Sequence, residues 1–194
     1  MNTKRLTLII IFIALTAALN LAGPKIPAPY APFLYYQLWE IPIVIAFLAV
    51  GPKAGVSVAV INTLILLAVF PGALPTGPFY NLIAVLSMLI GIYIPYKLAT
   101  HGHKTEDLGN FLQKHAKLIG ISATALGITS RVLVTTVTNY FLLQQPSPIG
   151  FSYKPEAALA FLPLSALFNA TVALYTIPIA LAVTIAIASK FKLQ

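Results

Sequence analysis

The sequence predicts an all-α membrane protein, folded as one compact bundle of six transmembrane helices. Three observations predict this fold class: six apolar segments, short loops between them, and basic residues that gather in alternate loops. The chain is 59% hydrophobic and 8% charged, with a mean hydropathy of +0.90, whereas about a quarter of the residues of soluble domains are charged. This composition excludes a soluble globular protein.

Each helix is expected where an apolar segment approaches the roughly 20 residues that cross a hydrocarbon core of about 30 Å. The expected helices, within a single domain of residues 1–194, are 6–22, 38–50, 55–70, 79–98, 117–143 and 163–189. The second and third are short and are separated by Gly51-Pro52-Lys53-Ala54-Gly55. Residues 38–70 could instead form one broken helix or a re-entrant pair; we count them as two crossings.

The basic residues of the loops predict the orientation in the membrane. If the N-terminus is cytoplasmic, the outer loops carry only Lys25 and Lys154. The inner side then carries Lys4, Arg5, Lys53, Lys97, Lys104, Lys114, Lys117, Lys190 and Lys192. This split follows the positive-inside rule with both termini in the cytoplasm. It makes 23–37 an outer loop and 99–116 a cytoplasmic loop with a small amphipathic helix. The first segment begins like a signal peptide but lacks a convincing cleavage site, so we expect a retained helix.

Motifs that the chain lacks argue against several function classes. There is no cysteine, hence no disulfide, thiolate metal site or Cys nucleophile. His101, His103 and His115 lie in or beside the cytoplasmic loop, so neither an intramembrane enzyme nor a metal site is expected. The cations form no stripe suited to nucleic acid, and no ATP-binding loop is present. A stand-alone secondary transporter stays an alternative, although no internal repeat is evident and only Glu40 could titrate near a pathway.

The outer loop is rich in proline and aromatic residues. Residues 23–39 contain four prolines and five aromatic residues, Phe33, Tyr35 and Trp39 among them. Proline lowers the entropy lost when a loop is held in place, and Tyr and Trp offer flat apolar faces with a polar group. The loop is therefore either a lid over a ligand that contains rings or an aromatic belt at the membrane interface.

Polar residues are few in the apolar segments, and several share a helix face. In the fifth segment these are Arg131, Thr135, Thr138 and Asn139. At the usual helical rise, Asn139 lies about 7 Å below the outer end of its helix. In the sixth segment Ser165, Asn169 and Thr176 share a face, with Asn169 about 9 Å below Pro163.

Two amides are therefore expected at similar depth on adjacent helices. Glu40 joins them at the outer start of the second helix, and Asn81 in the fourth segment completes the candidate binding set. A carboxylate and amides could hold a hydrophilic solute. The same side chains could instead bond a neighbouring helix, and Arg131 could pair with carbonyl groups or with Glu40. In the first segment, Ala14 and Ala18 are small residues four apart, for which packing inside the bundle is the default expectation.

These residues resemble the substrate-binding S components of energy-coupling factor (ECF) vitamin transporters, and among them the riboflavin-specific branch. Ala14 and Ala18 match the alanine pair with which S components dock on their membrane partner. Glu40-Ile-Pro42 followed by Gly51-Pro-Lys-Ala-Gly55 is similar to an acidic-x-Pro and Gly-Pro-x-Ala-Gly pattern, where aspartate is more usual than Glu40. The run from Arg131 to Asn139-Tyr140 resembles an Arg-to-Asn-Tyr helix, and Leu162-Pro163 with Phe168-Asn169 resembles a Pro then Phe-Asn element.

The resemblance implies a multi-pass protein of the cytoplasmic membrane that captures a vitamin, most closely riboflavin, from outside. It implies no cofactor besides that ligand, and as partners a transmembrane T component and two ATPases that drive inward release. Asn139 and Asn169 would hold the ribityl chain or the ring edge of a flavin, and the aromatic residues from Phe33 to Trp39 would close over it. The sequence departs from the riboflavin branch at Val172, where a ligand-contacting lysine is typical; another vitamin stays an alternative.

Overall fold

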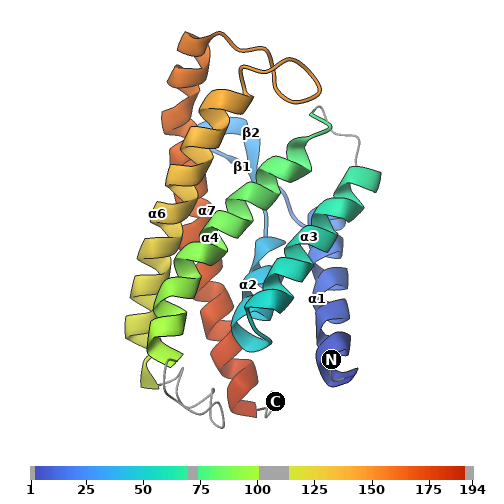
Figure 1. The fold of residues 1–194 in the computed structure, drawn as a ribbon, viewed down its shortest axis with the longest axis vertical. Coiled ribbons are helices and arrows are strands. Elements are labelled where there is room, and N and C mark those ends of the chain that lie inside the picture. Colours follow the sequence, from blue (N-terminus) through green and yellow to red (C-terminus); the bar gives the residue numbers. More distant parts are fainter. Residues whose placement is uncertain (1–2, 70–73, 101–113, 191–194) are drawn as a thin grey trace.

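The computed structural model describes residues 3–69, 74–100 and 114–190. Along these residues the elements are helix α1 (Thr3–Ala22), strands β1 (Ile26–Ala28) and β2 (Ala31–Tyr36), and helices α2 (Glu40–Ala49), α3 (Pro52–Val69), α4 (Gly77–Thr100), α6 (Ala116–Leu142) and α7 (Pro155–Lys190). The helices run lengthwise in one bundle (Figure 1). We call the end with the strands and the loop 143–154 the hairpin end, and the end where α1 begins and α7 stops the terminal end.

Five of these helices, α1, α3, α4, α6 and α7, are long and apolar enough to cross a membrane. The prediction of a sixth full crossing at 38–50 is not met, because α2 has ten residues and spans only about 15 Å. Nine of its ten residues are buried, so α2 lies in the middle of the bundle. The break before α3 occurs at Gly51, whose φ of +127° suits glycine. Pro52 then begins α3, a position that proline favours.

Helix α7 begins eight residues earlier than the expected start at Pro163. It runs from Pro155 with Glu156 in its first turn, and Pro163 and Pro178 lie inside it. Proline at the first position and an acidic residue in the first turn are ordinary signals for a helix start. Helices in membranes tolerate internal prolines because neighbouring groups satisfy the freed carbonyls. The prediction that this helix begins at Pro163 is therefore wrong.

The segment 23–37, the expected outer loop, contains a short β-hairpin, which an all-α prediction did not include. Strands β1 and β2 are antiparallel, with Ile26 opposite Tyr36 and Pro27 opposite Tyr35. In a two-stranded sheet both strands are edges, so proline is tolerated in them. The hydroxyls of Tyr30 and Tyr36 share a hydrogen bond of 2.6 Å. Desolvation and this hydrogen bond raise the pKa of Tyr30 to about 12, so its hydroxyl stays neutral in ordinary conditions.

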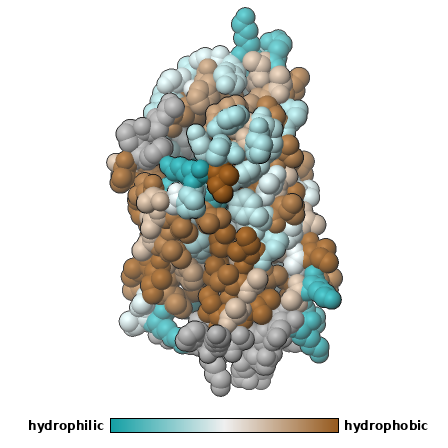
Figure 2. Space-filling view, turned by 180° about the vertical axis from the view of Figure 1, so that it is seen from behind, coloured by the Kyte–Doolittle hydropathy of each residue, from teal (hydrophilic) through white to brown (hydrophobic). Residues whose placement is uncertain are grey.

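The helices of the bundle approach one another closely where small residues face a neighbour. A Cβ added to Gly91 of α4 would lie 2.3 Å from the carbonyl oxygen of Leu126 on α6, so only glycine fits there. Outward surfaces are apolar: Leu118, Ile121 and Leu133 of α6 are between 62% and 72% exposed. Figure 2 shows apolar side chains covering much of the lower half of one face, with more polar residues in the upper half. Such a surface suits contact with lipid.

Candidate functional site

A cavity of about 400 Å³ lies in the half of the bundle at the hairpin end. It is lined by Asn20 near the end of α1, Glu40 at the start of α2, Leu66 near the end of α3, the first turns of α4, and facing parts of α6 and α7. The hairpin and Phe151 of the loop 143–154 contribute as well. Pockets for small molecules have volumes of about 300–1,000 Å³. The cavity is therefore large enough for a ligand with a fused ring system.

Most of the candidate binding residues line this cavity. They are Tyr35, Trp39, Glu40, Asn81, Arg131, Thr135, Asn139 and Asn169. Phe33 does not line it: its side chain is 63% exposed, and its ring lies 6.0 Å from that of Phe161. Along β2, Leu34 and Tyr35 contribute to the wall instead. All candidates that were chosen by polarity and helix periodicity therefore line the cavity, whereas one of the three aromatic candidates, Phe33, does not.

A buried ion pair joins α6 to α2 at the wall of the cavity. Both guanidinium Nη atoms of Arg131 donate to the carboxylate of Glu40, the Nη2–Oε1 bond being 2.9 Å long. The two residues are 3% and 4% exposed. A lone charge would be costly in this environment, and the planar two-point geometry satisfies both groups. Two partners within the protein were expected for Arg131, backbone carbonyl groups or Glu40, and the structure contains the pair with Glu40.

A chain of hydrogen bonds extends from this ion pair to both amides. Arg131 Nε donates to Asn169 Oδ1 at 2.9 Å, and Asn169 Nδ2 donates to the Ser165 carbonyl at 2.9 Å. Asn139 Nδ2 donates to Ser165 Oγ at 2.5 Å. Glu40, Arg131, Asn169, Ser165 and Asn139 thus form one polar network across α2, α6 and α7.

The network corrects the expected depth of the two amides. Because α7 begins at Pro155, Asn169 lies about 21 Å along its helix rather than about 9 Å. Asn139 is level with Ser165, and Asn169 is one turn, about 6 Å, closer to the terminal end. The amides are therefore linked through Ser165 and do not lie side by side.

Comparison with known proteins points to one family. No family model matches the chain. The riboflavin transporter RibU of Staphylococcus aureus (strain TCH60) is 30% identical to it over 143 residues, which is 73% of this chain and 66% of that protein. A solved S component of a bacterial ECF transporter superposes with a TM-score of 0.66 at 25% identity, over 91% of this chain and 93% of that one.

The chain belongs to the S components of ECF transporters.

This family assignment confirms the resemblance found in the sequence, and with it the prediction of a multi-pass membrane protein that is a transport subunit and not an enzyme. The aligned region spans just under two thirds of the length of the curated relative, 66%. Of the residues that carried the resemblance, Glu40, Arg131, Asn139, Phe168 and Asn169 line the cavity.

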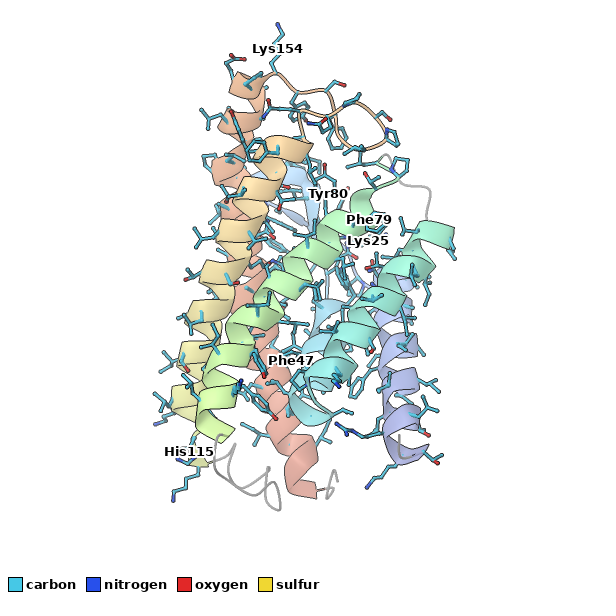
Figure 3. The ribbon with its side chains drawn as sticks, in the orientation of Figure 1. Lys25, Phe47, Phe79, Tyr80, His115 and Lys154 are labelled. Atoms are coloured by element: carbon cyan, nitrogen blue, oxygen red, sulfur yellow. The ribbon has the colours of Figure 1, made fainter. Side chains whose placement is uncertain are left out.

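Several residues that line the cavity of this S component were missed. Tyr175 lies seven residues after Phe168 on α7, a spacing that keeps both on one helix face, so the helical period could have identified it. Val172, which the sequence analysis named only for the absent lysine, lines the cavity as well. Asn20, Lys25, Gln37 and Tyr80 also line the cavity. Figure 3 shows Lys25 and Tyr80 in the half at the hairpin end, whereas His115 lies at the terminal end.

The hairpin of the S component is held against α7. The ring of Tyr36 stacks on Phe168 with 5.2 Å between centroids and 15° between planes. The hydroxyl of Tyr175 donates to the carbonyl of Gln37 at 2.6 Å, just after β2. On the other side of the cavity mouth, Tyr80 of α4 donates to the carbonyl of Ile149 at 2.8 Å. The two segments above the cavity are therefore each bonded to a helix that lines it.

The two alanines of α1 in the S component face away from the bundle. Ala14 and Ala18 are exposed, and Thr16 is the buried residue of this helix. The default expectation that these alanines pack inside the bundle is therefore wrong. Residues 101–113, most of the expected cytoplasmic loop 99–116 with His101 and His103, lie outside the described part of the chain.

Proposed function

We propose that this S component binds riboflavin in the cavity at the hairpin end. The observation that carries the proposal is the 30% identity to a riboflavin transporter together with a cavity whose walls combine amides and aromatic rings. Flat apolar faces suit a fused ring system, and amides suit its imide edge or its hydroxyls. The hairpin end then faces the outside of the cytoplasmic membrane, and both termini face the cytoplasm, in agreement with the positive-inside rule.

Within this proposal the two amides have different roles. The side-chain amide of Asn169 already accepts a hydrogen bond from Arg131 and donates one to Ser165. Much of its hydrogen-bonding capacity is therefore used within the protein, where it joins α6 to α7. Asn139 donates to Ser165 and keeps its carbonyl oxygen and a second N–H for a ligand. Glu40 and Arg131 neutralise each other and form a polar part of the cavity wall. Trp39 and Tyr35 cover the ring system from the side of the hairpin.

The partners follow from the same family membership. The exposed alanines of α1 would let a helix of the transmembrane T component approach closely, as small residues do at helix interfaces. Two ATPases bound to that component would supply the energy. The S component would then topple in the bilayer and release riboflavin inward.

The first test is to purify the protein from cells grown in rich medium and to record its visible absorption and flavin fluorescence. We expect either a bound flavin at a ratio of one per protein or quenching of added riboflavin with saturation at one equivalent. A colourless protein that fails to quench riboflavin would contradict the proposal. A vitamin screen by thermal shift would then follow, because Val172 gives the wall beside Asn169 an apolar side chain.

A second measurement separates an S component from a stand-alone carrier. The purified protein alone in liposomes should bind riboflavin without sustained uptake. Uptake against a gradient without partner subunits would contradict the assignment of an energising module. As a matched control, the same liposomes would carry an Asn139→Ala variant, which removes a proposed ligand contact and leaves the exposed face of α1 unchanged.

A further inference from the structure

Arg5, in the first turn of α1, reaches the corner between α2 and α3 at the terminal end. Its guanidinium Nη2 donates a hydrogen bond to the carbonyl of Val50 at 2.6 Å. Val50 is the C-cap residue of α2, and the last carbonyls of a helix have no partner inside the helix. A guanidinium at this place satisfies such a carbonyl and interacts favourably with the helix dipole. The bond therefore joins the beginning of α1 to the end of the buried helix α2.

The corner between α2 and α3 holds this carbonyl in a fixed place. Gly51 has a φ of +127°, which lets the chain turn sharply after Val50. A Cβ at Gly51 would lie 3.3 Å from Arg5 Nη2, closer than an ordinary contact. A Cβ at Gly55 would lie 2.5 Å from the Cβ of Phe47, so α3 packs directly on α2. The guanidinium of Arg5 therefore lies against a rigid corner in which glycine leaves it room.

The other inward contacts of α1 are mainly apolar. Thr16 is the buried residue of this helix. The Thr16 hydroxyl, the Asn20 amide nitrogen and the amide oxygen of Asn62 on the neighbouring α3 have no hydrogen-bond partner among the residues that the structure describes. The partly buried side chains of α1 that pack against the core are Leu8, Ile9, Phe12, Ile13 and Leu19. Because hydrophobic contact is not directional, these contacts allow α1 to slide or rotate, and the Arg5 bond opposes both motions.

The face of α1 that carries Arg5 lies opposite the face that carries the two alanines. At about 100° of rotation per residue, Arg5 and Thr16 lie within about 20° of each other around the helix. Ala14 and Ala18 each lie about 200° from Thr16, and both are exposed. A rotation or an axial shift of α1 would therefore move the alanines relative to the rest of the bundle.

We propose that Arg5 is a positioning residue, which fixes the rotation and the axial position of α1 on the corner of α2 and α3 and so presents Ala14 and Ala18 to the partner helix. The part that concerns the partner rests on the proposed function, whereas the position of α1 can be measured in the isolated protein. Helix α2 then has a bond to an arginine at each end, because Arg131 bonds Glu40 at its start.

The experiment measures the position of α1 by pulsed electron paramagnetic resonance between two spin labels. The chain has no cysteine, so labels can be placed at Ile11→Cys on α1 and Leu133→Cys on α6, where the native side chains are 53% and 62% exposed. The two helices lie on opposite sides of the bundle in Figure 1. The labelled protein is compared with the same protein carrying Arg5→Met, Arg5→Lys or the control Lys117→Met. Lys117 is in the first turn of α6, so the control removes the same charge from the same end without touching α1.

Arg5→Met should shift or broaden the distance distribution, whereas Lys117→Met should leave it unchanged. Arg5→Lys keeps the charge and an N–H donor, and its distribution should stay close to that of the labelled wild type. Riboflavin affinity should stay within about twofold in every variant, because Arg5 lies at the terminal end, away from the cavity. Binding of Arg5→Met to the purified T component with its two ATPases should weaken about five- to tenfold, since the partner must then order α1 on binding.

Other outcomes would overturn the inference in distinguishable ways. A broad distribution in the labelled wild type would overturn it without any further variant. A lower melting temperature of Arg5→Met with an unchanged distribution would assign Arg5 to the stability of α2 alone. A shifted distribution with normal binding of the partner subunits would refute the role in docking. A wild type that fails to bind those subunits, while Arg5→Met still shifts the distribution, would contradict the proposed partners and leave the positioning of α1 intact.

Discussion

Arg131 on α6 and Glu40 at the start of α2 are 91 residues apart in the chain, and their side chains form a two-point ion pair in the wall of the cavity. The pair joins the short central helix to one of the long helices. The shape of the cavity wall therefore depends on a contact between two helices that are far apart in the sequence.

Removal of one partner of this pair should be more harmful than removal of both. Arg131→Met leaves the Glu40 carboxylate buried without its partner and should lower the free energy of unfolding by about 3–5 kcal/mol. The double variant Arg131→Met with Glu40→Leu leaves no charge and should recover most of that loss. Thermal unfolding in detergent measures both. A loss of stability in the double variant equal to the sum of the losses in Arg131→Met and Glu40→Leu would contradict this account.

Asn139→Ala should weaken riboflavin binding with little effect on stability. The side chain makes one hydrogen bond, to Ser165, and is proposed to offer the rest to the ligand. We expect about tenfold weaker binding, which corresponds to about 1.4 kcal/mol. Asn169→Ala should lower both affinity and melting temperature, because it removes the acceptor of Arg131 Nε. Unchanged affinity in both variants would refute the proposed amide contacts.

The hydrogen bond from Tyr175 to Gln37 should slow the release of ligand. Tyr175→Phe removes this 2.6 Å bond between α7 and the end of the hairpin and keeps the ring beside Tyr36. We expect dissociation to become about five- to tenfold faster, because one buried hydrogen bond contributes about 1 kcal/mol. Stopped-flow fluorescence measures the rate. Tyr153→Phe, in the exposed loop, is the control and should leave the rate unchanged.

The close contact of α4 and α6 at Gly91 should not tolerate a side chain. Gly91→Ala places a Cβ 2.3 Å from the carbonyl oxygen of Leu126, so the helices must separate, at a cost of about 1–3 kcal/mol. Gly77→Ala is the control, because its Cβ would meet nothing within 4 Å. Melting temperatures of the two variants should differ clearly. Equal values would mean that the two helices can shift apart without loss.

The exposed alanines of α1 should affect uptake and not binding. Ala14→Leu and Ala18→Leu add bulk to a surface that faces away from the cavity, so riboflavin affinity of the isolated protein should stay within about twofold. Vitamin uptake in cells that contain the partner subunits should fall strongly, because the helix of the partner can no longer approach. Ala160→Leu, exposed on α7, is the matched control. Normal uptake in both α1 variants would refute docking through this face.

The sequence predicted helical features well because they depend on periodicity. The spacing of Arg131, Thr135 and Asn139 placed three polar side chains on one face of α6, and all three line the cavity. The helices followed from the apolar segments, and the pairing option of Arg131 with Glu40 followed from the high cost of a lone charge in lipid.

Features that depend on tertiary context were not predictable in the same way. The hairpin has prolines in both strands and no alternating pattern, so its pairing is set by contacts such as Tyr36 on Phe168. The start of α7 was missed because Pro163 reads as a boundary, whereas neighbouring helices permit proline inside α7. The unpaired atom of Asn62 has no signal in sequence at all, since its burial depends on how α1 and α3 meet.

The proline content of the segment 23–37 has a consequence for its position inside a membrane protein. A backbone N–H without a partner is costly in an apolar environment, and a two-stranded hairpin leaves the outer edges of both strands unpaired. Proline has no N–H, so Pro24, Pro27, Pro29 and Pro32 remove four donors that would otherwise need acceptors. A non-helical segment of this composition can lie among apolar helices, over a cavity, with few hydrogen bonds to satisfy when it moves.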